Sequence, residues 1–153
     1  MEKELTLKKL SVRHLRQVLG LKVRRDQRAF VASNGESLWD WLWVRLQGRW
    51  AQPLVLCRGD TVLGFLLLAY DREKQDYGIW RLMIGQAYQG RGYGKRTMEL
   101  CLSYLRSAPA GPGDSCSLSY EPENLPAARL YRSFGFRETG ERDGQELVAR
   151  RKL

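Results

Sequence analysis

The chain has 153 residues, of which 43% are hydrophobic and 28% charged, a composition that predicts one folded domain over residues 1–153. Its longest apolar run, residues 62–70, is too short to span a bilayer, and no basic-then-apolar segment opens the sequence, so we expect a cytoplasmic protein with no membrane partner. The net charge of +9 favours anionic partners, but the basic side chains are scattered, which argues against nucleic acid.

Hydrophobic periodicity and turn residues predict helices and strands along the whole chain. In chain order they are a strand at 4–8, helices at 12–20 and 38–46, strands at 53–57, 61–69 and 76–84, a helix at 94–105, a strand at 115–120, a helix at 124–134, and strands at 136–139 and 146–150. Ser11, Ser37 and Asn124 are the expected N-caps, and Gly20 is the expected end of the first helix. Turns are expected at 33–35, 58–60 and 143–144.

The resulting order, β-α-α-β-β-β-α-β-α-β-β, predicts an α/β (α+β) domain with a mixed, mostly antiparallel sheet flanked by helices. The strand at 76–84, the glycines after it and the next helix fall near the middle of this sheet, where a ligand crevice can form. Metal chemistry is not expected, because three cysteines (Cys57, Cys101 and Cys116) match no ligand spacing and His14 is the only histidine. We expect these thiols to be reduced and buried.

The segment after the 76–84 strand reads QGRGYGK from Gln89 to Lys95, with glycines at alternate positions. It is not a Walker A loop, because Lys95 is followed by Arg96 where that loop has Ser or Thr. It is not a dinucleotide fingerprint either, because Lys95 stands where the third glycine should be. Backbone N–H groups at a helix start, with Arg91 and Lys95 beside them, could bind a phosphate. A flexible turn with a basic surface is the alternative, and the spacing alone leaves both open.

The pattern Gln89-x-x-Gly92-x-Gly94 resembles the pyrophosphate-binding motif of the GNAT family of N-acetyltransferases. A second segment, NLPAARLYRSFGF from Asn124 to Phe136, is similar to the family pattern N-x-x-A-x-x-L-Y-x-x-x-G-F. The order of predicted elements also resembles that of the family, so the likeness covers nearly the whole chain. It implies an enzyme that transfers an acetyl group from acetyl-coenzyme A, used as a cosubstrate, to a primary amine.

The resemblance also implies roles for particular residues. Those expected to contact coenzyme A are Leu82, Met83, Ile84, Gln89, Gly90, Arg91, Gly92, Tyr93, Gly94, Lys95, Asn124, Ala128, Tyr131 and Arg132. The pantetheine arm is expected to pair with the main chain of 82–84, where an N–H of Met83 or Ile84 would face the thioester oxygen. Tyr131 is expected to act as the general acid that protonates the departing thiolate. An aromatic residue that only packs a helix on the sheet is the alternative for Tyr131.

Several segments, among them 30–34, 62–65 and 79–84, are similar to the bacterial diamine and spermidine acetyltransferase branch. That likeness implies a small amine acceptor, and the expected acceptor residues are Glu36, Trp39, Asp40 and Trp80. The general base is not selected: Glu121, Glu123 and a chain of waters are all candidates. By the same resemblance, a homodimer is expected.

Other functions stay open from the sequence. The charge of +9 disfavours a polycation at long range, so an amino acid or a peptide amine is a second class of acceptor. A relative that binds acetyl-coenzyme A without transferring acetyl is another reading. A nucleic-acid-binding module would use the basic charge and the five tryptophans, but it does not explain why the glycine loop is followed by the 124–136 segment.

Overall fold

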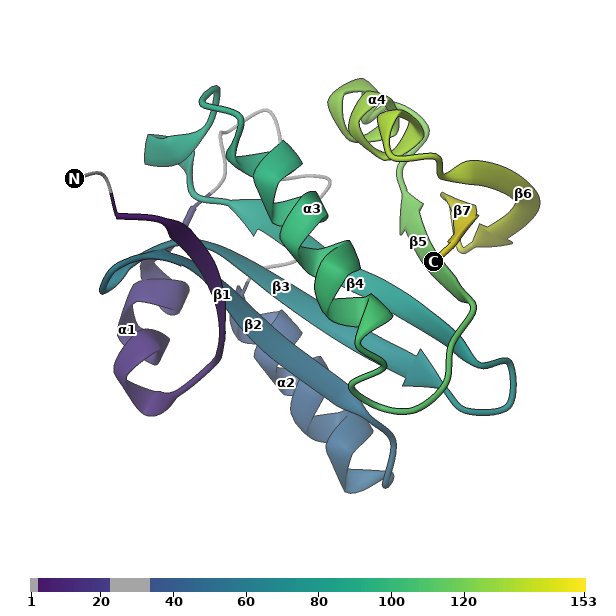
Figure 1. The fold of residues 1–153 in the computed structure, drawn as a ribbon, viewed down its shortest axis with the longest axis horizontal. Helices are drawn as coiled ribbons and strands as arrows, with labels where there is room; N and C mark the ends of the chain where they lie inside the picture. Colours follow the sequence, from purple (N-terminus) through teal and green to yellow (C-terminus); the bar gives the residue numbers. More distant parts are fainter. Residues whose placement is uncertain (1–2, 23–33) are drawn as a thin grey trace.

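The computed structural model describes residues 3–22 and 34–153 and contains the predicted elements in the predicted order (Figure 1). Their bounds are β1 Leu5–Lys9, α1 Val12–Gly20, α2 Asn34–Leu46, β2 Ala51–Arg58, β3 Thr61–Asp71, β4 Asp76–Ile84, the 3-10 turn η2 Gln86–Tyr88, α3 Tyr93–Arg106, β5 Ser115–Tyr120, α4 Leu125–Ser133, β6 Arg137–Asp143 and β7 Glu146–Lys152. The predicted bounds of β4 and β5 agree with the structure at both ends.

The seven strands form one sheet in the order β1-β2-β3-β4-β5-β7-β6. Every neighbouring pair is antiparallel except β4 and β5, which are parallel, so the predicted mixed and mostly antiparallel sheet is confirmed. The parallel pair is short, because Asp76–Ile79 pairs with Ser115–Leu118 and the pairing ends there. Beyond this point β4 and β5 diverge, as Figure 1 shows, and the sheet opens at its centre.

Helices cover the sheet on both faces, with α1 and α2 on one side and α3 and α4 on the other (Figure 1). Along β3 the side chains alternate between these layers: Phe65 packs in the cluster of α1 and α2, while Leu66 packs in the cluster of α3. Both are fully buried, which explains why the central strand β3 has a continuous apolar run instead of alternation. None of the helices in the described segments is long and apolar enough to cross a membrane.

Two predictions about local structure are wrong. Helix α2 begins at Asn34, so Asn34 and Gly35 belong to the helix, and Ser37 is a buried residue of its first turns instead of its cap. Packing against the sheet overrides the weak turn preference of these residues. Strand β6 also runs further than predicted, to Asp143, because a register shift at Gly140 (φ +87°) lets the strand bend and continue.

The other local predictions are confirmed. Ser11 is the N-cap of α1, and its backbone N–H donates to Nδ1 of His14 at 3.2 Å. Asn124 caps α4, and the three cysteines are free and buried. Ser33 and most of the 30–34 segment lie outside the described residues.

Candidate active site

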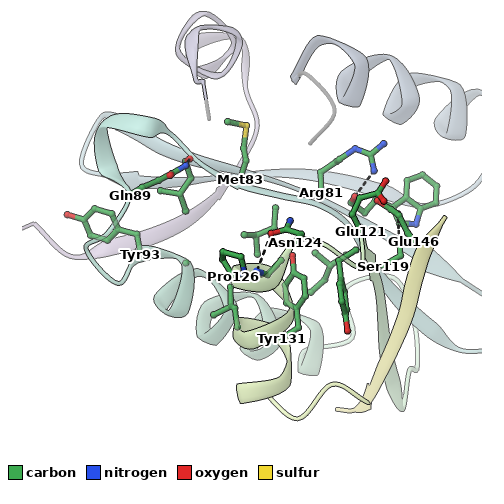
Figure 2. A pocket seen from close by; sticks show the side chains of 18 of the residues that line it. Arg81, Met83, Gln89, Tyr93, Ser119, Glu121, Asn124, Pro126, Tyr131 and Glu146 are labelled. Atoms are coloured by element: carbon green, nitrogen blue, oxygen red, sulfur yellow. Dashed lines mark hydrogen bonds between the residues drawn. The ribbon is translucent and has the colours of Figure 1, made fainter. Parts of the chain in front are cut away.

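A cavity of about 730 Å³ lies where β4 and β5 diverge, within the size range of small-molecule sites. Its walls come from the second half of β4, the glycine loop, the end of β5, the start of α4 and the β6–β7 hairpin. Figure 2 shows Gln89 and Tyr93 toward one end, Arg81, Glu121, Ser119 and Glu146 toward the other, and Tyr131 between them. The described residues contain no group of three or more His, Cys, Asp or Glu side chains that could hold a metal ion.

The glycine loop lines this cavity with Gly90, Gly92 and Gly94. Gly92 is the N-cap of α3, and it adopts a left-handed conformation (φ +79°), as Gly90 does (φ +74°), which explains glycine at both positions. The first intrahelical bond runs from the Arg96 N–H to the Gly92 carbonyl, so the N–H groups before it have no helical acceptor. No atom lies within 4 Å of where a Cβ would stand on Gly90 or Gly92, so a ligand can approach the backbone there.

The end of the cavity beside the glycine loop also has basic side chains near it and one hydrogen bond from a side chain to β4. Arg96 is engaged by Glu99 at 3.1 Å, whereas Arg91 and Lys95 make no ion pair with any residue that the structure describes. Gln89 lines the cavity and donates from Nε2 to the Ile84 carbonyl at 2.8 Å, which ties the loop to the end of β4. Arg91 and Lys95 flank the cavity without lining it.

The second half of β4 has a free backbone edge toward the cavity. Gly85 donates its N–H to Leu63 of β3 at 2.9 Å, so its peptide groups face β3. Because these groups alternate in direction along an antiparallel pair, those of Met83 also face β3, while those of Leu82 and Ile84 face the gap. Of the two N–H groups predicted to meet the thioester oxygen, that of Ile84 is therefore the one directed into the gap.

Tyr131 stands at the middle of the cavity. Its ring packs on Tyr120 (centroids 5.7 Å apart) and on Phe136 (6.1 Å), and its hydroxyl has no hydrogen-bond partner among the described residues. Burial raises the pKa of this phenol to about 12, and the nearby carboxylate of Glu146 acts in the same direction. The hydroxyl is therefore protonated at neutral pH and free to donate to a ligand.

Asn124 both caps helix α4 and lines the cavity. Its Oδ1 accepts from the Ala127 N–H at 3.4 Å, as an N-cap does, and the residue lines the cavity next to Pro126. Ala128 packs against the core on the α3 side, and Arg132 is exposed, so neither of these two predicted contacts lies in the cavity wall.

The other end of the cavity is acidic. Glu121, Asp143 and Glu146 line it together with one cationic side chain, Arg81. Ser119 Oγ donates to Glu146 at 2.6 Å, which fixes that carboxylate at the start of β7. Among the predicted bases, Glu121 is in the wall, whereas Glu123 is exposed and outside it.

Arg81 is held by its own contacts. Nη1 donates to the Trp80 carbonyl at 2.7 Å, and Nη2 lies 3.5 Å from Oδ2 of Asp40 on α2. This pair brings one predicted acceptor residue, Asp40, to the margin of the cavity, and a second, Trp80, lies in its wall. Glu36 and Trp39 do not line it, and Trp39 is 69% exposed.

The sequence analysis missed ten wall residues, and four of them carry a charge or a serine hydroxyl: Arg81, Ser119, Asp143 and Glu146. They come from β4, β5 and the β6–β7 hairpin, and no spacing in the sequence connects them. The only signal was the Gly144-Gln145-Glu146 turn, which marked a hairpin but not the direction of its side chains.

Comparisons with known proteins agree with this geometry. Residues 21–136 match the model of the acetyltransferase (GNAT) family. The spermine/spermidine N(1)-acetyltransferase of Bacillus subtilis is 27% identical over an alignment of 141 residues that covers 87% of this chain and 89% of that protein. The spermidine N-acetyltransferase of Vibrio cholerae, solved with CoA and spermine, superposes with a TM-score of 0.73 at 20% identity, covering 97% of this chain and 94% of that one. An acetyltransferase of Thermus thermophilus gives a TM-score of 0.75 at 18% identity, with 100% of both chains covered. The chain therefore belongs to the acetyltransferase (GNAT) family, whose enzymes move an acetyl group from acetyl-coenzyme A to an amine.

Proposed function

We propose that this chain acetylates a primary amine of a diamine or polyamine, with Tyr131 as the general acid. The observation that carries the proposal is the charge of the cavity's acceptor end, where three carboxylates face one guanidinium in a protein of net charge +9. A local acidic site of this kind offsets the long-range repulsion that a polycation meets. The relatives named as spermine and spermidine acetyltransferases support the same class of acceptor.

The opposite end fits the donor. The pyrophosphate of acetyl-coenzyme A would accept from the N–H groups of the glycine loop, with Arg91 and Lys95 adding positive charge. The pantetheine amides would pair with the outward main-chain groups of Leu82 and Ile84, as an added strand does. Gln89 already uses the Ile84 carbonyl, so the N–H of Ile84 remains for the thioester oxygen.

In the transfer, a neutral amine attacks the thioester carbonyl, the C–N bond forms, the C–S bond breaks, and the leaving thiolate takes a proton. Tyr131 would supply that proton from its free hydroxyl. From a pKa of about 12 to a thiol near 8.5 the step is uphill. The nitrogen becomes cationic as it attacks, and a cation beside a phenol lowers its pKa, which makes the transfer feasible.

At the acceptor end, Glu121 and Glu146 would bind an ammonium group that does not react, and the indole of Trp80 would cover it. A carboxylate is a much weaker base than an amine, so we assign Glu121 and Glu146 to binding and leave the proton to water. Arg81 already contacts Asp40 and the Trp80 carbonyl, which leaves fewer of its N–H groups for the carboxylate of an amino acid acceptor.

The test is to incubate the protein with acetyl-coenzyme A and each of a panel of amine acceptors, and to measure the rate at which the free thiol of coenzyme A is released. We expect activity with spermidine, spermine or a diamine, and little with a neutral amino acid. Glu146→Gln and Glu121→Gln should raise the KM for the polyamine by about 10-fold or more, since each removes a charge from an ammonium contact. The matched control is Glu123→Gln, an exposed acid outside the cavity, which should leave KM unchanged.

Two outcomes would contradict the proposal. If Glu121→Gln, Glu146→Gln and the control Glu123→Gln change the polyamine KM equally, the acidic end of the cavity is not the acceptor site. Tight binding of coenzyme A by calorimetry, without thiol release for any amine, would mean a binding protein and not a transferase.

A further inference from the structure

Gly78 lies inside β4, where a glycine weakens the strand and therefore needs a reason. The backbone gives none, because φ of Gly78 lies outside the left-handed region and other residues could adopt it. The space beside Gly78 does give a reason, since a Cβ there would stand 3.2 Å from both Cδ1 and Nε1 of Trp80. The next nearest described atom, the Cβ of Ala69, would be 4.0 Å away. It is therefore the Trp80 indole that occupies the space of a side chain at position 78.

A β-bulge at Trp80 directs its side chain to the same face of the sheet as position 78. Ile79 and Arg81 pair with consecutive residues of β3, so Trp80 is the extra residue between them. Residues two apart share a face in a regular strand, yet Ile79 packs in the core cluster of α3, whereas Arg81 reaches Asp40 on α2. The bulge thus places Trp80 and Arg81 together on the α2 side, and the Trp80 indole lies back along β4 against Gly78.

The contact between Trp80 and Gly78 lies where the cavity opens. Pairing between β4 and β5 ends at Ile79, and the two residues that follow it, Trp80 and Arg81, both line the acceptor end. The Trp80 side chain is 39% exposed, and its indole N–H has no acceptor among the described residues. Packing, rather than a hydrogen bond, therefore positions the ring, and Gly78 is part of the surface on which it packs.

We propose that Gly78 is a specificity-determining position for the acceptor, because the space it leaves sets where the Trp80 indole stands in the cavity wall. The inference rests on the proposed function in one respect, namely that the acceptor binds at this end of the cavity. Carbon atoms pack at about 3.5 Å or more, so a methyl group at position 78 moves the indole by a few tenths of an ångström, and a larger side chain displaces it. A displaced indole no longer covers an ammonium group in the same geometry.

The test is to measure KM for spermidine and for acetyl-coenzyme A in Gly78→Ala and Gly78→Val, each with and without Trp80→Ala. We expect the spermidine KM to rise about 3-fold in Gly78→Ala and about 30-fold in Gly78→Val, while KM for acetyl-coenzyme A changes less than about twofold. With alanine at position 80, Gly78→Ala should leave the spermidine KM unchanged, because no indole remains to be displaced. Gly20→Ala is the matched control: it adds the same methyl group where no atom lies within 4 Å, and should change neither KM.

NMR gives a readout that does not depend on activity. The indole N–H signal of Trp80, identified as the one lost in Trp80→Ala, should shift in Gly78→Ala and stay in place in Gly20→Ala. Urea unfolding of each variant separates a moved indole from a damaged fold.

Three outcomes would overturn the role of Gly78: an indole signal that does not move, an acceptor KM that ignores both Gly78 variants, or a KM rise that is equally large without the indole. If spermidine is not acetylated, the same measurements are made with the amine that gives the fastest thiol release. A KM for that amine that responds as described would contradict the proposed acceptor class and support the role of Gly78. Absence of thiol release with every amine would contradict both.

Discussion

Replacing Tyr131 with phenylalanine removes one hydroxyl and keeps the ring on Tyr120 and Phe136. That hydroxyl has no hydrogen-bond partner among the described residues, so its loss leaves no protein group unpaired, and we expect a change in stability below about 1 kcal/mol at neutral pH. Loss of a general acid costs about 10²–10⁴ in rate, or roughly 3–5 kcal/mol of transition-state stabilisation. The variant should thus lose kcat and keep its fold.

The assay is thiol release at saturating acceptor, with KM for acetyl-coenzyme A measured beside kcat. We expect kcat to fall at least 100-fold while this KM changes by less than about threefold, since the phenol is needed for the leaving group and not for binding. Because the pKa of Tyr131 is about 12, the wild-type rate should show no loss from its ionisation below pH 10. An unchanged kcat in Tyr131→Phe would refute the acid role and leave the residue as a packing aromatic.

Three further predictions follow from the same structure. Gly92→Ala should cost about 1–2 kcal/mol in unfolding experiments, because φ is +79° there, and should raise the KM for acetyl-coenzyme A about 10-fold; normal affinity would exclude close phosphate approach. Gly64→Ala should cost about 1–3 kcal/mol, because its Cβ would lie 2.7 Å from the Met83 carbonyl oxygen, whereas Gly20→Ala, with no atom within 4 Å, should not destabilise. Between pH 10 and 12 the wild type should lose stability relative to Tyr131→Phe by at most about 3 kcal/mol, because an unfolded tyrosine ionises near pH 10 and the folded one near 12; parallel denaturation curves would contradict the raised pKa.

The order of elements was predictable from the sequence, because each element carries its own signal. The continuous apolar residues of β3 predict a buried strand, and the proline and glycines of residues 108–114 predict the loop that separates α3 from β5. The start of α2 was not predictable, since Asn34 and Gly35 favour a turn in isolation and become helical only through the packing of the helix on the sheet. The register shift at Gly140 was likewise hidden, because it depends on the pairing with β7.

The proposed donor end of the cavity could be read from the sequence, and most of the proposed acceptor end could not. The phosphate cradle that we propose requires positive φ at Gly90 and Gly92 and free N–H groups at a helix start, and such local requirements leave a continuous motif. Arg81, Glu121 and Glu146 leave no such motif, since they lie on β4, directly after β5 and at the start of β7, far apart in the sequence.

The sequence by itself determined the family, the order of strands and helices, and the helix whose Tyr131 lines the cavity, because all three depend on short segments with strong local requirements. Only the tertiary structure decided which charges share the cavity, which N–H of β4 points into it, and which side of α2 stays exposed. The physical reason is the divergence of β4 and β5. It opens the sheet at a place that no local sequence preference marks, and it leaves a gap with the free edge of β4 on one side and the end of β5 and the start of β7 on the other.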